Sequence, residues 1–179
     1  DSTDFVNLDN ILAGFISGAK GDTAVMNNEE AQRIFEEGME NFQRQRMMSQ
    51  YGENKAAGER KMAEVAQKEG VQSLGDGVYY EVITEGKGAV PADTSTVAIK
   101  YVGTLLVEGT EFDRSRNDEP YKSRANQFIP GFTKALTAMP AGSKWKVYIP
   151  QEQAYGERQM GQINPFSALV FELELVSVE

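Results

Sequence analysis

The six prolines of this 179-residue chain all lie between Pro91 and Pro165, and the first 90 residues contain none. Proline removes a backbone N–H and clashes with the preceding helical turn, so a long proline-free segment can stay helical. Residues 1–70 are also rich in Ala, Glu, Gln, Met and Lys, whereas Val, Ile, Thr, Tyr and Phe concentrate further on. This segregation predicts an α+β chain with a helical first half and a mostly β second half.

Two apolar repeats at helical spacing lie in the first half. The first repeat is Leu8, Ile11, Leu12, Phe15 and Ile16, and the second is Ala31, Ile34, Phe35, Met39 and Phe42. The acidic pair Glu29 and Glu30 precedes the second repeat and favours a helix N-terminus there. Two short apolar helices do not make a convincing core alone. They either pack on the β half or, as we favour, pair with a second copy of the chain.

The helical pattern continues beyond the second repeat with few apolar residues to bury. A single helix over residues 28–69 would be about 60 Å long, and Gly52 and Gly58 would each weaken it by roughly 1 kcal/mol. A helix that is polar all round is typical of a connector. We therefore predict a helical dimerisation region and stalk over residues 1–69, a linker over 70–77, and a second domain over 78–179.

Alternating apolar and polar residues predict about five strands in the second domain. They cover residues 78–84, 96–106, 110–113, 142–150 and 168–178. A short helix is expected between Pro130, at its first position, and Pro140, beyond its end. Along residues 142–150, Trp145, Val147 and Ile149 should face inward. The expected domain is an antiparallel sheet covered by one short helix.

The chain contains no histidine and no cysteine. This composition excludes Ser-His-Asp catalysis and thiolate metal sites, and no phosphate-binding loop is present. The net charge of −9 argues against binding to nucleic acid or to anionic lipid. No apolar run approaches the length of a membrane span. We expect neither a metal nor a cofactor.

Aromatic residues are more numerous in the second domain than one sheet and one helix should need in a core. They are Tyr101, Phe112, Tyr121, Phe128, Phe132, Tyr155, Phe166 and Phe171. Taken singly, each is more typical of core than of a site, but several follow Gly or Pro, where loops expose them. The surplus predicts an apolar cleft with a few polar groups at its edge, suited to a peptide-like ligand.

Six motifs in one order resemble the FKBP-type peptidyl-prolyl cis-trans isomerases. They are "VAIKYVGTL", "EGTEFDRS", "FIPGFTKAL", "MPAGSKWKVYIP", "AYG" and "INPFSALVFELELVSV". The resemblance covers residues 77–178. The helical segment "ENKAAGERKMAEVAQKEGV" is similar to the macrophage-infectivity-potentiator (Mip) branch of bacterial envelope FKBPs. That branch implies a homodimer, here through residues 1–50, and a long helix that carries each isomerase domain. It also implies the periplasm or the outer membrane. The chain begins with Asp1 rather than Met, which is compatible with the earlier removal of a leader or a lipid anchor.

The resemblance assigns roles to ten residues. The substrate-binding residues would be Tyr101, Phe112, Tyr121, Phe128, Ile129, Phe132, Ile163 and Phe171. The catalytic residues would be Asp113 and Tyr155, whose hydroxyl can hydrogen-bond a substrate carbonyl. Asp113 would act on the rotating amide or order Tyr101, or else be a structural acceptor beside Arg116.

The aromatic side chains Tyr101, Phe112, Phe132 and Phe171 would hold the prolyl ring, and the Ile129 N–H would anchor the substrate chain. The family commonly has tryptophan at the position of Phe132, and Phe166 follows an Asn-Pro pair where the family has Pro-Pro-Asn. Both departures affect turnover and preference more than fold.

Two functions remain open from the sequence. The first is an isomerase that assists folding of exported proteins, because rotation about an X-Pro bond needs no histidine or cysteine. The second is a dimeric envelope chaperone or peptide-binding module with weak or no isomerase activity. The partners in both cases are proline-containing unfolded or extended polypeptides. Deleting residues 1–69 is expected to spare catalysis on short peptides and to weaken holding of unfolded protein.

Overall fold

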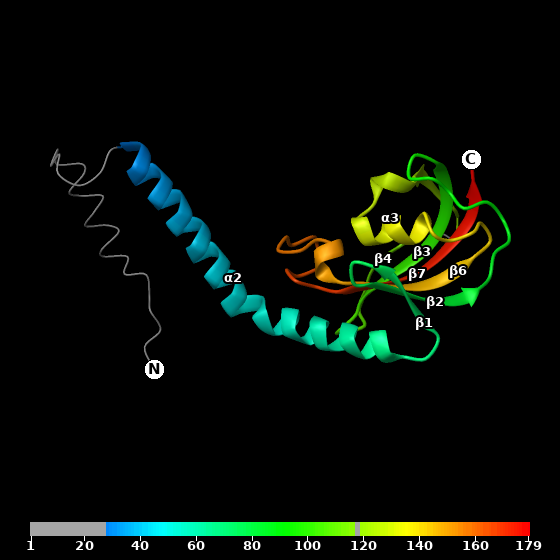
Figure 1. Cartoon of the computed structure of the whole chain (residues 1–179), viewed down its shortest axis with the longest axis horizontal. Helices are drawn as coiled ribbons and strands as arrows, with labels where there is room; N and C mark the ends of the chain where they lie inside the picture. Colours follow the sequence, from blue (N-terminus) through cyan, green and yellow to red (C-terminus); the bar gives the residue numbers. More distant parts are fainter. Residues whose placement is uncertain (1–27, 117–118) are drawn as a thin grey trace. The chain divides into compact units, whose positions relative to one another are not determined.

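The computed structural model describes residues 28–116 and 119–179 (Figure 1). The chain divides into two compact units, residues 1–50 and 51–179. The first apolar repeat, from Leu8 to Ile16, lies outside the described residues. The second repeat lies in helix α2 (Asn28–Gln67), as predicted. None of the helices in the described part of the chain is long and apolar enough to cross a membrane.

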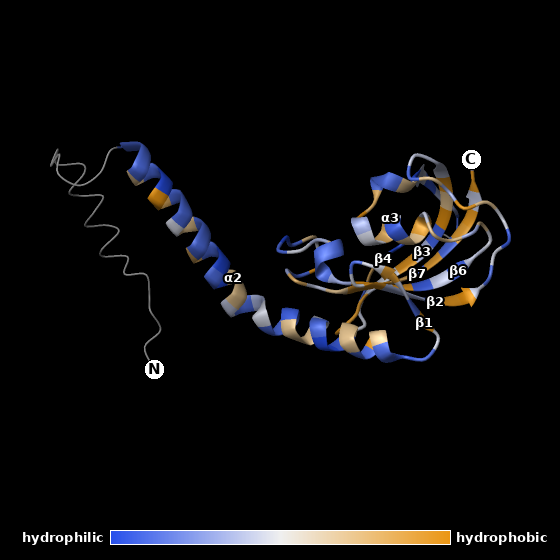
Figure 2. Cartoon of the chain, in the orientation of Figure 1, coloured by the Kyte–Doolittle hydropathy of each residue, from blue (hydrophilic) through white to orange (hydrophobic). Residues whose placement is uncertain are grey.

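The N-terminal part of α2, residues 28–50, exposes its apolar side chains. The exposed residues are Ile34, Phe35, Met39, Phe42 and Met48, at 41–49% of their full surface. Apart from Ala31, Gly38 and Met47 the rest of this segment is polar, and Figure 2 shows α2 as largely hydrophilic with isolated hydrophobic residues. We call these five side chains the α2 stripe.

A seven-stranded antiparallel sheet forms the body of the second unit within the described residues. Its strands are β1 (Val71–Gly75), β2 (Val78–Thr84), β3 (Thr96–Leu105), β4 (Glu111–Arg114), β5 (Tyr121–Arg124), β6 (Lys144–Ile149) and β7 (Leu169–Val178). The strand order is β1-β2-β6-β7-β3-β4, and β5 pairs with the other half of β3. The C-terminal strand β7 therefore lies at the centre, between β6 and β3 (Figure 1).

The sheet has two more strands than the sequence predicted, β1 and β5. Strand β1 falls within residues 70–77, which corrects the expected linker. Asp76 and Gly77, with φ of 52° and 77°, form the two-residue turn that pairs β1 with β2, and Asp-Gly is favoured where both central residues need positive φ. Strand β5 is short and mostly exposed at an edge, so it has no alternating pattern to detect.

Helix α3 (Pro130–Leu136) packs on one face of this sheet, with Pro130 in its first turn as predicted. Its buried residues Phe132, Ala135 and Leu136 belong to one hydrophobic cluster with the inward side chains of β3, β6 and β7. The predicted inward residues Trp145, Val147 and Ile149 are all in this core. The β half therefore has the predicted architecture, an antiparallel sheet wrapped on a short helix.

The second part of α2, residues 51–67, packs against the face of the sheet opposite to α3. Met62 and Val65 form a cluster with Tyr148 and Val170, which point away from α3. Gly58 lies one turn earlier, and a Cβ placed there would be 3.5 Å from the Cβ of Ala168. The prediction of a stalk with little to bury is thus wrong for this segment, because a stripe with spacings of four and three residues suffices to bury one helix face.

A polar cluster joins the end of α2 to the sheet. The Glu81 carboxylate accepts hydrogen bonds from Lys68 Nζ at 2.8 Å and from the Tyr148 hydroxyl at 2.5 Å. These two bonds, led by that from Lys68, lower the pKa of Glu81 below its usual value. Burial, followed by the bond to Glu81, raises the pKa of Tyr148. The cluster therefore holds an ionised carboxylate and a neutral phenol.

Candidate functional site

A cavity of about 410 Å³ opens beside the N-terminus of α3. Twelve residues line it: Tyr101, Phe112, Asp113, Gln127, Phe128, Ile129, Pro130, Phe132, Ala154, Tyr155, Arg158 and Phe171. They come from strands β3, β4 and β7, from the junction of the 3-10 helix η2 (Ala125–Gln127) with α3, and from the loop after β6. All of these elements belong to the second compact unit.

Aromatic rings form the floor of the cavity around Phe132, which is only 3% exposed. Its ring centroid lies 4.7 Å from that of Phe128 and 4.9 Å from that of Phe171. The Phe171 ring also meets the ring of Phe112 edge to face, with centroids 5.6 Å apart. Edge-to-face contacts hold rings in fixed orientations, so the floor is a preformed apolar surface.

Gly103 on β3 makes room for two of these rings. It pairs with Phe171 on β7 on one side and with Asp113 on β4 on the other. A Cβ placed on Gly103 would come within 2.7 Å of Phe112 Cζ and 2.8 Å of Phe171 Cε1. These distances are shorter than any van der Waals contact allows, so only glycine lets both rings approach the strand.

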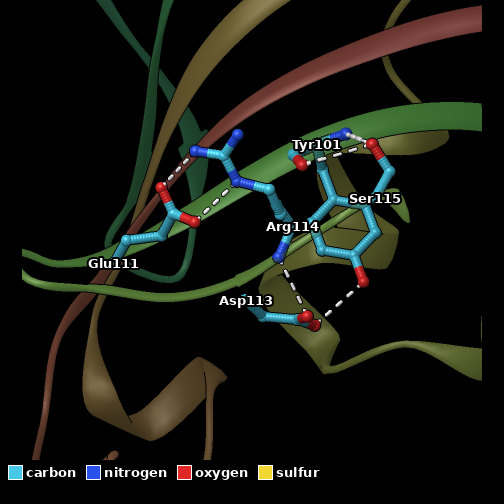
Figure 3. Close-up of polar contacts among 5 residues, drawn as sticks. All are labelled: Tyr101, Glu111, Asp113, Arg114 and Ser115. Atoms are coloured by element: carbon cyan, nitrogen blue, oxygen red, sulfur yellow. Dashed lines mark hydrogen bonds and ion pairs between the residues drawn. The ribbon is translucent and has the colours of Figure 1, made fainter. Parts of the chain in front are cut away.

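The polar side of the cavity centres on Tyr101 and Asp113 (Figure 3). The Tyr101 hydroxyl donates to Asp113 Oδ2, and the backbone N–H of Arg114 donates to Asp113 Oδ1, both at 2.9 Å. The Arg114 guanidinium instead binds both carboxylate oxygens of Glu111. Burial, with a further contribution from Asp113, raises the pKa of Tyr101. Tyr101 therefore remains a neutral hydrogen-bond donor throughout the physiological pH range.

Two donors at the cavity have no acceptor within the described residues. The Tyr155 hydroxyl makes no hydrogen bond there, and neither does the backbone N–H of Ile129, although the Ile129 carbonyl caps α3. Arg158 uses Nε to bind the Tyr155 carbonyl at 3.4 Å. The cavity thus combines an apolar floor with two donors available to a bound carbonyl group.

Eight of the ten site residues predicted from the sequence line this cavity, and Tyr121 and Ile163 do not. Tyr121 is 53% exposed and contacts Phe128, with ring centroids 6.3 Å apart. Ile163 is only 4% exposed and belongs to the core, because its backbone pairs with Met160 and turns the side chain inward. The alternative role predicted for Asp113 was a structural acceptor beside Arg116. Within the described residues no hydrogen bond joins these two side chains, and Asp113 accepts from Tyr101 and Arg114 instead.

The predicted set lacked four lining residues: Gln127, Pro130, Ala154 and Arg158. Pro130 was identified only as the start of a helix. Gln127 and Arg158 are exposed polar residues, which carry no periodic signal in a single sequence. Their neighbours in "NQFIPGF" and "AYGER" were the available clue.

Comparison with known families gives two matches that together cover nearly the whole chain. Residues 87–176 match the family described as FKBP-type peptidyl-prolyl cis-trans isomerase. Residues 1–82 match the domain described as amino terminal to FKBP-type peptidyl-prolyl isomerase. The first match contains every residue that lines the cavity.

Individual relatives agree with these matches. The chain is 50% identical over 125 residues to the FKBP-type 22 kDa peptidyl-prolyl cis-trans isomerase of Escherichia coli K12, which covers 69% of this chain and 60% of the relative. It is 34% identical to the outer membrane protein MIP of Legionella longbeachae, covering 97% of this chain and 76% of that protein. Its fold is similar to the crystal structure of FkpA from Escherichia coli, with a TM-score of 0.71 at 34% identity, over 97% of this chain and 83% of that one. The chain thus spans 60–76% of the length of these two curated relatives.

Proposed function

Because this chain belongs to the FKBP-type peptidyl-prolyl cis-trans isomerases, we propose that its aromatic cavity binds a proline ring and accelerates rotation about the preceding peptide bond. The observation that supports this proposal best is the enclosure of one apolar floor by Tyr101, Phe112, Phe132 and Phe171. A prolyl ring is apolar and has no N–H, so such a floor suits it.

The two free donors complete the binding site. The Ile129 N–H would bind a backbone carbonyl of the substrate chain, and the Tyr155 hydroxyl would donate to a second one. Both groups have no acceptor among the described residues, so binding a substrate costs no existing hydrogen bond. These two hydrogen bonds would hold the peptide while the X-Pro bond turns.

Catalysis would follow from preferring the twisted amide over the planar one. Rotation must overcome a resonance barrier of about 18–20 kcal/mol. The planar amide has the larger dipole and loses more solvation in an apolar cavity, whereas donors placed for the twisted geometry stabilise the transition state. Asp113 would contribute by holding Tyr101, through the hydrogen bond already described. No proton transfer is needed, in keeping with a chain that lacks histidine and cysteine.

A protease-free assay on a short X-Pro peptide tests this function. Phe132→Leu should lower kcat/KM roughly tenfold because edge-to-face contacts to the ring are lost. Tyr155→Phe should lower it about fivefold, equivalent to the ~1 kcal/mol of one neutral hydrogen bond. Tyr80→Phe is the matched control, because its hydroxyl binds Gln72 away from the cavity. A wild type no faster than buffer, with native Trp145 fluorescence, would overturn the proposal.

The α2 stripe supports a second role, in holding unfolded proteins as a homodimer. Five large apolar side chains exposed on one helical segment are more than a solvated helix needs. We infer that residues 1–50 pair with a second copy, and that the pair binds proline-containing unfolded polypeptides with the avidity of two sites. The relative called an outer membrane protein supports a location in the bacterial envelope, which fractionation of cells that express the chain would test.

Light scattering of the purified chain tests the dimer. Phe35→Glu places a charge in the α2 stripe and should convert the dimer to monomer at micromolar concentration, while Gln45→Glu adds the same charge at an exposed polar position. Suppression of aggregation of an unfolded protein should fall with Phe35→Glu and isomerisation of a short peptide should not. A wild type that is monomeric at 100 μM contradicts this role.

A further inference from the structure

The side chain of Asn54, on α2, contacts residues 165–167, which lie just before strand β7. Its Nδ2 donates hydrogen bonds to the Pro165 carbonyl at 2.8 Å and to Ser167 Oγ at 3.0 Å. Pro165 and Ser167 are buried, and Asn54 is half-buried. These contacts join positions 111 and 113 residues apart in the sequence, and both lie within the second compact unit.

Asn54 binds the residues on both sides of Phe166, whose backbone conformation is strained. Phe166 has φ of 61° although it is not glycine, and such a conformation costs of order 1–3 kcal/mol unless its surroundings hold it. Gly58, one turn later on α2, brings the helix close, so that a Cβ there would be 3.9 Å from the Phe166 carbonyl oxygen. The helix therefore holds residues 165–168 in a conformation that they would not keep alone.

Residues 165–168 are also hydrogen-bonded directly to the loop after β6 that carries Tyr155. The Phe166 N–H donates to the Gly156 carbonyl at 2.8 Å, and Gly156 follows Tyr155, which lines the cavity. Two hydrogen bonds thus connect the Asn54 amide to the loop that carries Tyr155, one to Pro165 and one between its neighbour Phe166 and Gly156, which follows Tyr155. Because the Tyr155 hydroxyl has no acceptor among the described residues, only its backbone and ring packing fix its position.

From this chain of contacts we propose that Asn54 is a positioning residue of the isomerase, through which α2 sets the place of the Tyr155 hydroxyl in the cavity. The inference rests on the proposed function, since it assigns Asn54 to the same site. It gives α2 a role beyond connecting the two units. A misplacement of about 1 Å costs up to ~100-fold in rate when groups must align, so a remote amide can matter to turnover.

Asn54→Asp is the sharpest test, because the carboxylate has the same shape as the amide but cannot donate to the Pro165 carbonyl. We expect kcat/KM on a short X-Pro peptide to fall by up to about fivefold, mainly in kcat, because the loss cannot exceed that of Tyr155→Phe. Gln67→Ala is the matched control, since it removes an exposed amide from the same helix that makes no hydrogen bond within the described residues. Ser167→Ala, which removes one of the two acceptors and leaves the Pro165 carbonyl, should lower kcat/KM two- to threefold and serves if Asn54→Asp does not fold.

A double-mutant cycle distinguishes positioning from general destabilisation. In a Tyr155→Phe background the hydroxyl is absent, so adding Asn54→Asp should change kcat/KM less than twofold. Equal losses in the two backgrounds, or an Asn54→Asp variant as active as the wild type, overturn the proposal.

A readout that does not need activity separates this inference from the proposed function. Asn54→Asp should speed hydrogen exchange of the Phe166 amide and shift the NMR signals of the Tyr155 ring, while amides of the central strand β7 keep their protection. If the wild type does not isomerise the peptide, the proposed function fails and these shifts still decide whether Asn54 positions Tyr155. Unchanged Phe166 exchange and Tyr155 signals would reject the positioning role.

Discussion

The hydroxyl of Tyr101 donates a 2.9 Å hydrogen bond to Asp113 across the paired strands β3 and β4 (Figure 3). Asp113 has a second donor in the Arg114 backbone N–H, so its carboxylate is oriented from two directions. Two roles remain for this carboxylate: it orders the Tyr101 ring at the cavity wall, or its charge acts on the rotating amide.

Replacement of Asp113 by Asn and by Ala separates these roles. An Asn carbonyl still accepts from the Tyr101 hydroxyl, so if ordering dominates, Asp113→Asn should keep kcat/KM within about threefold while Asp113→Ala loses roughly tenfold. Each loss is a difference in transition-state free energy, tenfold being about 1.4 kcal/mol. The measurement is the protease-free peptide assay. Equal losses for the two variants would instead assign the effect to the carboxylate charge.

Gly103→Ala should damage the cavity without touching a polar group. The added methyl would overlap both Phe112 and Phe171, and such overpacking costs about 1–3 kcal/mol. We expect a lower melting temperature and a kcat/KM reduced at least about fivefold, because the two rings must move apart. Gly109→Ala is the comparison variant. A Cβ at Gly109 would meet no atom within 4 Å, so only the positive φ of that residue adds strain. Wild-type activity in Gly103→Ala would contradict the view that the rings are preset.

The Glu81 cluster should make stability depend on acidic pH. The pKa of Glu81 is lower in the folded chain than its usual value, so its contribution is fully present above about pH 4.3, the ordinary Glu value. That contribution is lost as the pH falls through the lower folded pKa. Charge-assisted hydrogen bonds are worth about 1.5–3 kcal/mol each at most, so Glu81→Gln should lower the free energy of unfolding by about 1–2 kcal/mol at pH 7.

Denaturant unfolding at several pH values checks this dependence. The gap between wild type and Glu81→Gln should stay constant from pH 7 to about pH 5 and shrink below pH 4. Glu64→Gln is the matched control on α2, because its pair with Lys61 is well exposed and such pairs contribute little. A gap that widens on acidification would show that the Glu81 pKa is not lowered by folding.

Alternation along single strands was a sound guide to the core. It predicted the inward side of β6, and the structure buries Trp145, Val147 and Ile149 against α3. Tyr148 lies on the opposite side of β6 from these three residues, yet it is only 4% exposed. Its cover is supplied by Met62 and Val65 of α2, far away in sequence, and no local pattern contains that pairing.

Family motifs were a good guide to the cavity residues of β3, β4 and β7, of the start of α3 and of the loop at Tyr155, but not to Tyr121 on β5. Ile163, in an irregular loop bridged to Met160, lies in the hydrophobic core and not in the lining of the cavity. The motifs also gave no sign of Asn54, because its partners are a backbone carbonyl and a serine in a distant segment. Contacts of this kind depend on tertiary packing and leave no periodic trace.

Two truncated forms test where the isomerase unit begins. The fragment 51–179 keeps Asn54, Met62 and Val65, so it should retain the wild-type kcat/KM on a short peptide.

The fragment 70–179 was expected from sequence to be equally active, but it uncovers Tyr148 and Val170. Burying a large apolar side chain contributes about 1.5–3 kcal/mol, so loss of Met62 and Val65 should lower the free energy of unfolding by roughly 3–6 kcal/mol. Loss of the Asn54 hydrogen bonds should also reduce its kcat/KM by up to about fivefold at temperatures where it remains folded. Unfolding followed by Trp145 fluorescence, with the peptide assay beside it, measures both effects, and two fragments of equal stability and activity would show that α2 is only a connector.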